Sequence, residues 1–274
     1  MKLAFLEKKS IEMRKKIFNK FYLLKEGHPG SVMSLMDILI VLYYSGFVRR
    51  IKQKKKYPFK DDIIISKGHA TVGQYPILHD LKVISSKDWN NWGINQKTCL
   101  KMFGNNYIPG IKTTTGSLGH GIGIGTGIAF SAKKKKIDKR VYVIISEGEL
   151  YEGSTWESLL LLSSLKLDNL YIILDINNNI ILGDPKNCLD LGNIKKKIES
   201  FGIRVEKCNG HDFAQIYSKL KKIHKFKGPV CLLANTIKGK GIKIMENKPN
   251  WHYWNNISEE IYNKSLTLLD NLYE

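Results

Sequence analysis

The chain alternates between amphipathic stretches and short apolar runs. Apolar residues recur at approximately helical spacing from Glu7 to Lys25, and the turn residues Gly27-His28-Pro29-Gly30 then end the predicted helix. We expect Ser31 or Ser34 to cap a second, apolar helix that runs to about Tyr44. The first part of the chain is therefore predicted to form two helices joined by a sharp loop.

Four short runs rich in β-branched residues predict buried strands. They are Asp61–Ser66, Val141–Ile145, Leu170–Leu174 and Val230–Leu233. Stretches with helical patterning separate these runs, and this alternation is typical of an α/β fold with a parallel sheet covered by helices on both faces. No internal repeat or linker divides the sequence, so we expect residues 1–274 to form a single three-layer domain.

Polar residues and glycines follow each predicted strand, in the segments 66–69, 146–149, 175–179 and 235–241. Ligands of parallel sheets bind beyond the carboxyl ends of the strands. We therefore expect these four loops to meet at one edge of the sheet.

A glycine-rich segment, 116–127, precedes a plausible helix that runs through Ala132. Glycines allow a ligand or another backbone to approach closely, and the amides at the start of a helix favour anions. Close packing of the helix explains the same glycines equally well. This segment alone therefore does not specify a site.

Glu147 and Asn177 follow two successive predicted strands. If these strands are neighbours, a carboxylate and an amide oxygen face each other at the same edge of the sheet. Such oxygen ligands suit Mg²⁺ shared with a phosphate group. Taken alone, a carboxylate and an asparagine at such positions more often form ordinary hydrogen bonds within loops.

The composition is that of a folded globular protein, but the net charge is unusually positive. The 274 residues are 43% hydrophobic and 25% charged, which is ordinary for a globular chain, but the net charge of +19 favours an anionic partner. Only five residues are arginine (Arg14, Arg49, Arg50, Arg140 and Arg204), so the guanidinium groups suited to base recognition are scarce. We expect a lysine-rich surface, which includes 133–136, 195–197 and 219–227, and no specific nucleic-acid binding.

The four cysteines, Cys99, Cys188, Cys208 and Cys231, show no paired spacing. No secretory leader and no apolar run of membrane-spanning length accompanies them. We expect reduced, mostly buried thiols, a cytoplasmic location and no membrane association.

An ordered series of motifs joins these observations. The series consists of Gly27-His28-Pro29-Gly30-Ser31, Ser66-Lys67-Gly68-His69-Ala70, Thr114-Thr115-Gly116-Ser117-Leu118-Gly119, Glu147-Gly148-Glu149-Leu150-Tyr151-Glu152-Gly153, Asp175-Ile176-Asn177, Lys238-Gly239-Lys240-Gly241, and Glu246-Asn247 followed by Trp251-His252. In this order the motifs resemble those of transketolases. Over nearly its whole length the chain is similar to the N-terminal subunit of a split transketolase.

The resemblance implies the thiamine diphosphate-binding fold, with thiamine diphosphate and Mg²⁺ as cofactors. Glu147, the side chain of Asn177 and the backbone carbonyl of Asn179 match the metal ligands of the family. The positions that match its cofactor-binding residues are His69, Gly116, Ser117, Leu118, Gly148, Glu149, Asn177 and His252. Gly116 and Leu118 belong to the loop that holds the aminopyrimidine.

By the same resemblance, His28, His69 and His252 are the expected catalytic residues, with His28 beside the reacting groups of the substrate. Glu152 matches a carboxylate that links paired active sites, and we expect it to be buried and hydrogen-bonded. The implied reaction transfers a two-carbon ketol unit from a ketose or ketose phosphate to an aldehyde.

The family's pyrimidine-binding domain, with the glutamate that activates the cofactor, has no counterpart in the sequence. We expect it on a separate chain, so that this chain is inactive alone and works in an α2β2 assembly. Two positions depart from the family: Glu147 replaces the usual aspartate, and Phe103 lies where a histidine is usual. The second departure indicates either a specialised ketol donor or a diverged, weak enzyme.

Two other functions remain open. One is a subunit of a thiamine-dependent 2-oxo acid decarboxylase or dehydrogenase E1 component. The other is a catalytically inactive, lysine-rich scaffold or non-specific nucleic-acid binder on the same fold. His28 and the Trp251-His252 pair favour transketolase over the first, and retention of His69 and Asn177 argues against the second.

Overall fold

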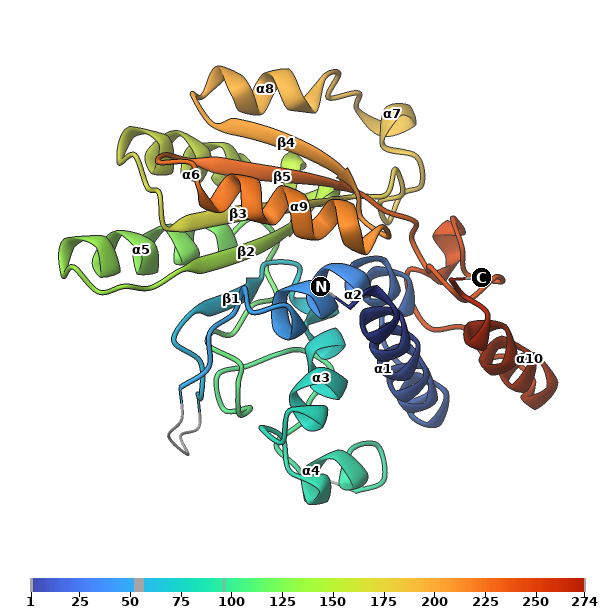
Figure 1. The fold of residues 1–274 in the computed structure, drawn as a ribbon. Coiled ribbons are helices and arrows are strands. Elements are labelled where there is room, and N and C mark those ends of the chain that lie inside the picture. Colours follow the sequence, from blue (N-terminus) through green and yellow to red (C-terminus); the bar gives the residue numbers. More distant parts are fainter. Residues whose placement is uncertain (1, 52–56, 96, 274) are drawn as a thin grey trace.

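A five-stranded parallel sheet forms the centre of the computed structural model, which describes residues 2–51, 57–95 and 97–273 (Figure 1). The strands are β1 (Asp62–Ile65), β2 (Val141–Ser146), β3 (Leu170–Ile176), β4 (Arg204–Asn209) and β5 (Val230–Asn235). Their order is β1-β2-β3-β5-β4, and every neighbouring pair is parallel. All four strands predicted from apolar runs are present.

The strand β4 was not predicted because, unlike β1 at the opposite edge of the sheet, it exposes half of its residues. Only Val205, Glu206 and Cys208 are buried in it, whereas Arg204, Lys207 and Asn209 are exposed. An edge strand needs no continuous apolar run, so its sequence resembles a polar connector.

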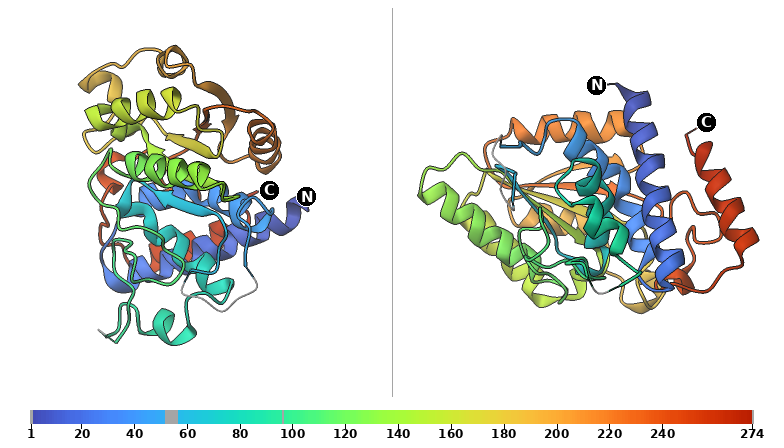
Figure 2. Two further views of the ribbon diagram at one scale, coloured as in Figure 1. Left: turned by 90° about the vertical axis from the view of Figure 1, so that its left-hand side faces the viewer. Right: turned by 90° about the horizontal axis from the view of Figure 1, so that it is seen from below.

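Helices cover both faces of the sheet, which confirms the three-layer α/β prediction (Figure 2). One face packs against α1 (Leu3–Leu24), α2 (Pro29–Tyr44) and α9 (Phe213–His224), and the other against α5 (Gly121–Lys134), α6 (Gly153–Ser164) and α8 (Ile194–Ser200). Side chains along a strand alternate between these two cores: Ile144 faces the first and Val143 the second.

Shorter elements complete the described chain. The helices are α3 (Tyr75–Asp80), α4 (Ser86–Asn91), α7 (Pro185–Cys188) and α10 (Glu259–Asp270), and the 3₁₀ turns are Gly68–Gln74, Glu147–Tyr151 and Pro249–Trp251. None of the described helices combines the length and apolarity needed to cross a membrane.

The start of α2 differs from the prediction. The helix begins at Pro29, and His28 is its N-cap residue without a side-chain capping bond. Proline suits the first helical position because its fixed φ is already helical and its missing N–H is not needed there. Ser31 and Ser34 therefore lie inside the helix, where both are buried.

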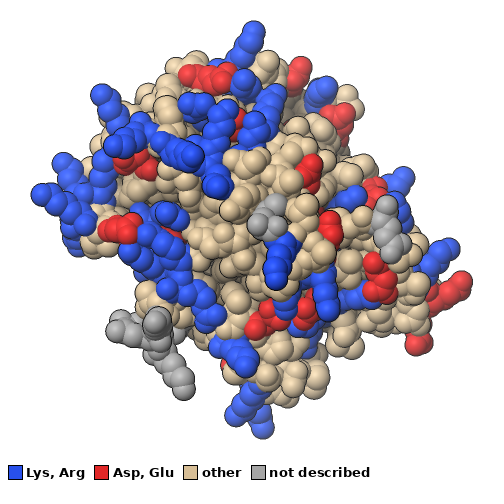
Figure 3. All heavy atoms as spheres, in the orientation of Figure 1, with Lys and Arg blue, Asp and Glu red and all other residues tan. Residues whose placement is uncertain are grey.

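The predicted surface lysines lie where expected. Residues 133–136 are exposed, and lysine and arginine side chains are scattered over the face seen in Figure 3 with acidic residues among them. Of the cysteines, Cys208 and Cys231 are buried, Cys99 is partly buried and Cys188 is exposed. The prediction of buried thiols therefore holds for the two strand residues only.

Candidate functional site

A cavity of about 640 Å³ opens where the loops after the strands meet. Its walls come from segments far apart in the sequence: His28, Ser31, Lys67, His69, Phe103, Gly116, Leu118, Ser146, Glu147, Gly148, Tyr151, Glu152, Asn177, Asn179, Ile180, Ile181, Leu182, Cys188, Leu189, Lys238, His252 and Tyr253. β2 and β3 are neighbours, with Ser146 paired to Asp175, so Glu147 and Asn177 emerge side by side. The expected convergence at one sheet edge is confirmed.

Three imidazoles form a cluster in the cavity wall. The ring centroids of His28 and His69 are 4.8 Å apart, those of His28 and His252 5.4 Å, and those of His69 and His252 5.5 Å. Burial and the positive charge of Lys238 lower the pKa of His28 and of His252 to about 4. Burial also lowers the pKa of His69 well below its ordinary value. All three rings are therefore neutral at neutral pH and can accept a proton.

Two buried lysines stand behind this cluster, and neither was predicted as a site residue from the sequence. Lys67 forms an ion pair with Asp175, which also accepts hydrogen bonds from Ser34 and Thr236. Lys238 is 2% exposed, and its Nζ donates to the carbonyls of Asn179 (2.8 Å) and Ile180 (3.5 Å).

Lys238 has no carboxylate among its hydrogen-bond or ion-pair partners in the described residues. Its Nζ also lies 3.3 Å from Nδ1 of His252. Burial, and then the charge of Lys67, lowers the pKa of Lys238 to about 8, so the ammonium form still predominates at neutral pH. A buried cation without an acidic partner is costly. The site therefore favours an anionic ligand.

The expected metal ligands lie together at the carboxyl ends of β2 and β3. Glu147 is buried, and its Oε2 accepts a hydrogen bond from the Asn178 amide at 2.8 Å. Burial raises the pKa of Glu147, and the bond from Asn178 opposes that rise. The side-chain oxygen Oδ1 of Asn179 is buried without a hydrogen-bond partner in the described chain.

These oxygens fit Mg²⁺, with one difference from the expected ligand set. The Asn179 carbonyl already accepts a hydrogen bond from the Lys238 ammonium, whereas the orphaned group on the same residue is the side-chain oxygen. Among the residues described, no cluster of three His, Cys, Asp or Glu side chains is placed to hold a metal without other ligands. A cation here would need amide oxygens and further oxygen ligands such as phosphate.

Glu149 does not line the cavity. It is completely buried, and its carboxylate accepts hydrogen bonds from the Ser66 hydroxyl, the Gly119 amide (3.0 Å) and the Ser146 amide (2.8 Å). Burial raises the pKa of Glu149, and the bond from Ser66 opposes that rise. Glu149 therefore connects the glycine-rich loop to the ends of β1 and β2 and supports the position of that loop.

Two further predicted residues differ from expectation. Ser117 is exposed and lies outside the cavity lining, although its neighbours Gly116 and Leu118 are part of it. Glu152 lines the cavity but is only half-buried, and in the described chain its side chain has no hydrogen-bond partner. Its expected burial and hydrogen bonding are therefore not found in this chain by itself.

Two aromatic side chains flank His28 at the cavity mouth. The ring of Phe103, 45% exposed, lies 5.8 Å from that of His28, and the ring of Tyr253 lies 4.9 Å from it. Tyr253 was not predicted as a site residue because an isolated surface tyrosine carries no motif. The mouth of the cavity is consequently more apolar than its floor.

Comparisons with known proteins show the family of the chain. A family model described as "Transketolase, thiamine diphosphate binding domain" matches residues 12–264. The chain is 36% identical over 230 residues to a subunit of the apulose-4-phosphate transketolase of Actinobacillus succinogenes, and the match covers 83% of this chain and 82% of that protein. The subunit of the same name from Phocaeicola vulgatus is 33% identical over 254 residues, covering 92% and 90%.

Among solved structures, the fold is similar to that of a transketolase from Campylobacter jejuni. The TM-score is 0.89 at 29% sequence identity, and the match covers 98% of this chain. It covers only 43% of the Campylobacter chain, so the present chain spans less than half the length of that enzyme.

Proposed function

The chain belongs to the transketolase family, and we propose on this basis that it is the N-terminal subunit of a split, thiamine diphosphate- and Mg²⁺-dependent transketolase. The reaction would transfer a two-carbon ketol unit from a ketose or ketose phosphate to an aldehyde. One observation carries the proposal: the buried, carboxylate-free ammonium of Lys238 lies beside three neutral imidazoles at the edge where Glu147 and Asn177 meet.

The proposed roles of the residues follow from the charges of their side chains. Lys238 and Lys67 offset the negative charge of the diphosphate, and His69 and His252 donate hydrogen bonds to the bound cofactor or substrate. Glu147, Asn177 and Asn179 hold Mg²⁺ against the diphosphate. Glu149 and Gly148 keep the loops around the cofactor in place. When bound, thiamine diphosphate supplies a nucleophilic carbon and then an electron sink for carbon–carbon bond cleavage.

The substrate is assigned to the mouth of the cavity, beside His28. A neutral imidazole there accepts a proton from a substrate hydroxyl and returns it later. Phe103 and Tyr253 give this region apolar walls, which fits a donor with fewer hydroxyl contacts than an ordinary sugar phosphate. The two similar subunits are named for apulose 4-phosphate, so this ketose phosphate belongs among the donors to be tested.

A second chain would complete the site. The two similar bacterial proteins are named as subunits, and the matched Campylobacter transketolase is more than twice as long as the match. We propose that residues 1–274 are one diphosphate-binding domain, that the pyrimidine-binding domain with its activating glutamate is a separate cytoplasmic chain, and that the assembly is α2β2. The exposed apolar side chains Ile181, Leu182 and Leu189 beside the cavity are suited to such a contact.

Calorimetric titration of thiamine diphosphate tests the proposal. The full chain is titrated with Mg²⁺ and with a chelator, each with and without the candidate partner. We expect binding that requires the metal and tightens with the partner, and ketol transfer only when both chains are present. Absence of binding with a verified partner would contradict the proposal, and turnover of 2-oxo acids instead of ketoses would identify the E1-type alternative.

A further inference from the structure

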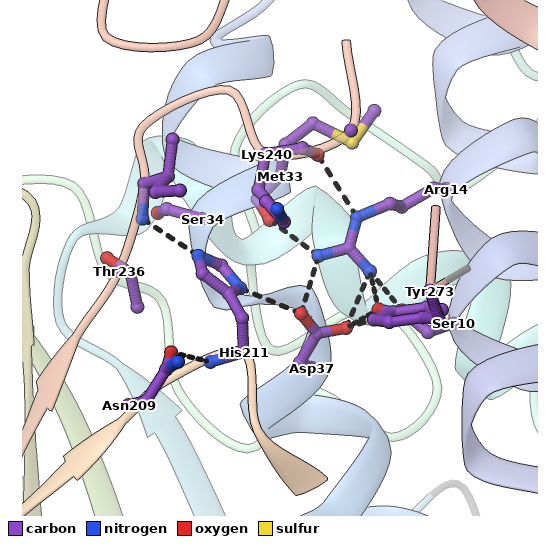
Figure 4. A network of polar contacts seen from close by, with 12 residues as sticks. Ser10, Arg14, Met33, Ser34, Asp37, Asn209, His211, Thr236, Lys240 and Tyr273 are labelled. Atoms are coloured by element: carbon purple, nitrogen blue, oxygen red, sulfur yellow. Dashed lines mark hydrogen bonds and ion pairs between the residues drawn. The ribbon is translucent and has the colours of Figure 1, made fainter. Parts of the chain in front are cut away.

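A buried polar network lies directly behind the segment that carries Lys238 (Figure 4). The carboxylate of Asp37 on α2 accepts hydrogen bonds from Arg14 on α1, at 2.7 and 3.0 Å, and from the hydroxyl of Tyr273 at 2.5 Å. Arg14 also donates to the carbonyl of Lys240 at 3.2 Å. Arg14 and Asp37 are fully buried, so the network is not a surface feature.

His211 joins this network to the Lys238 segment. Its Nδ1 lies 2.8 Å from Oδ2 of Asp37, and its Nε2 lies 2.8 Å from the backbone nitrogen of Ile237. A backbone N–H is only a donor, so Nε2 accepts and the ring proton is on Nδ1. Asp37 thus holds His211 in the neutral tautomer that fixes the Ile237 amide.

Two neighbouring amides of this segment are held by backbone carbonyls. The amide of Thr236 donates to Ile176 (2.8 Å) and that of Gly239 donates to Gly30 (3.0 Å). The Ile237 amide is instead held by a side chain, immediately before the residue whose ammonium reaches the cavity. His211 therefore holds the backbone at Ile237, and a change at His211 would shift the next residue, Lys238.

The turn that carries His211 is fitted closely to the same segment. A Cβ at Gly210 would clash with the methyl group of Thr236, so only glycine allows this approach. The side chain of Asn209 accepts a hydrogen bond from the His211 amide at 2.9 Å. The close approach at Gly210 and the hydrogen bond to Asn209 together fix the position of the His211 imidazole.

We propose that His211 is a positioning residue that, held by Asp37, fixes the Ile237 peptide and so places the Lys238 ammonium for a diphosphate ligand. The inference rests on the proposed function, because it takes the ligand to be the diphosphate of the cofactor. His211 itself does not line the cavity.

A double-mutant cycle with pyrophosphate as the probe tests this role. Affinity of the full chain is measured by calorimetry with Mg²⁺ for wild type, H211L, K238M and H211L/K238M. If His211 acts through Lys238, H211L weakens binding roughly tenfold in the wild-type background and less than about twofold when Lys238 is absent. An equal loss in both backgrounds, or no loss in H211L, would overturn the proposal.

Two variants separate positioning from general destabilisation. In H211Q, the amide offers an acceptor and a donor at about the spacing of the ring nitrogens, so affinity should return to within about threefold of wild type. H224L removes another imidazole, which pairs with the Tyr142 hydroxyl near the opposite end of β2. It should lower thermal stability but leave pyrophosphate affinity unchanged, and a loss in H224L equal to that in H211L would also refute the role.

Hydrogen exchange tests the same idea without a ligand. The Ile237 amide should be protected in wild type and H211Q and exchange much faster in H211L, while the Gly239 amide stays protected. If no anion binds even with the partner present, the proposed function fails, but the exchange result still decides whether His211 fixes this peptide. Unchanged protection of Ile237 in folded H211L would disprove it.

Discussion

The ammonium of Lys238 shows how position changes the chemistry of a common residue. Most lysines of this chain lie on the surface, and their charges are solvated. At Lys238, burial and the nearby charge of Lys67 lower the pKa to about 8, which is close to physiological pH. The charge that would hold a diphosphate is therefore sensitive to pH.

Thiamine diphosphate affinity should fall as pH rises from 7 to 9. Lys238 is mostly protonated at pH 7 and mostly neutral at pH 9, so loss of its charge weakens anion binding by up to about tenfold over this range. Calorimetry at several pH values, in the presence of Mg²⁺, measures the slope.

The control variants for this profile differ only in the lysine removed. K238M should bind weakly at every pH and lose most of the slope, whereas K243M, which removes an exposed lysine, should behave like wild type. A profile in K238M as steep as that of wild type would assign the titration to another group.

The glycines of helix α5 differ in what surrounds them. Its glycines fall on two sides of the helix. Gly125 faces the sheet, where a Cβ would clash with Val143, whereas Gly127 is exposed with no atom within reach of a Cβ. Close packing explains the first, and nothing within the described chain requires the second.

Alanine substitutions should therefore have opposite effects at these two positions. G125A overpacks the contact with β2 and should lower the free energy of unfolding by about 1–3 kcal/mol. G127A removes the helix cost of an exposed glycine and should raise it by up to about 1 kcal/mol. Urea denaturation of the isolated chain measures the free energy of unfolding of both variants. Destabilisation by G127A would contradict the open space found around Gly127.

The whole molecule combines a strongly positive surface with buried neutral histidines. Burial lowers the pKa of His28, His252 and His224 to about 4, which is below the ordinary value of 6.5. Between these values the unfolded chain binds protons that the folded chain does not. Acid thus favours the unfolded state even before carboxylates are protonated.

Folding stability should accordingly decrease as pH falls from about 7 to 4. Each histidine that stays neutral in the fold steepens the decline by at most about 1.4 kcal/mol per pH unit. Urea denaturation at a series of pH values measures the slope, and H224L should make it shallower. A stability that is flat or rises over this range would contradict the buried neutral state of these rings.

The strands β1, β2, β3 and β5 could be predicted from local sequence, because a strand buried on both faces must be apolar throughout. The family could be recognised in the same way, since the motifs at the strand ends are local and ordered. The convergence of Glu147, Asn177 and His69 followed from the rule that parallel strands end at one edge. His28 and His252 follow no strand, and only the family resemblance placed them in the site. These features depend on neighbours in the chain or on a general rule of topology.

The remaining features became visible only in the packed molecule. The edge strand β4 lacks an apolar run, and the start of α2 depended on whether Pro29 or a serine set its first turn. The burial of Glu149 and the lack of a carboxylate in hydrogen-bond or ion-pair contact with Lys238 in the described chain arise from segments far apart in the sequence. The charge state and partners of a buried group depend on everything packed around it, and no local pattern contains that information.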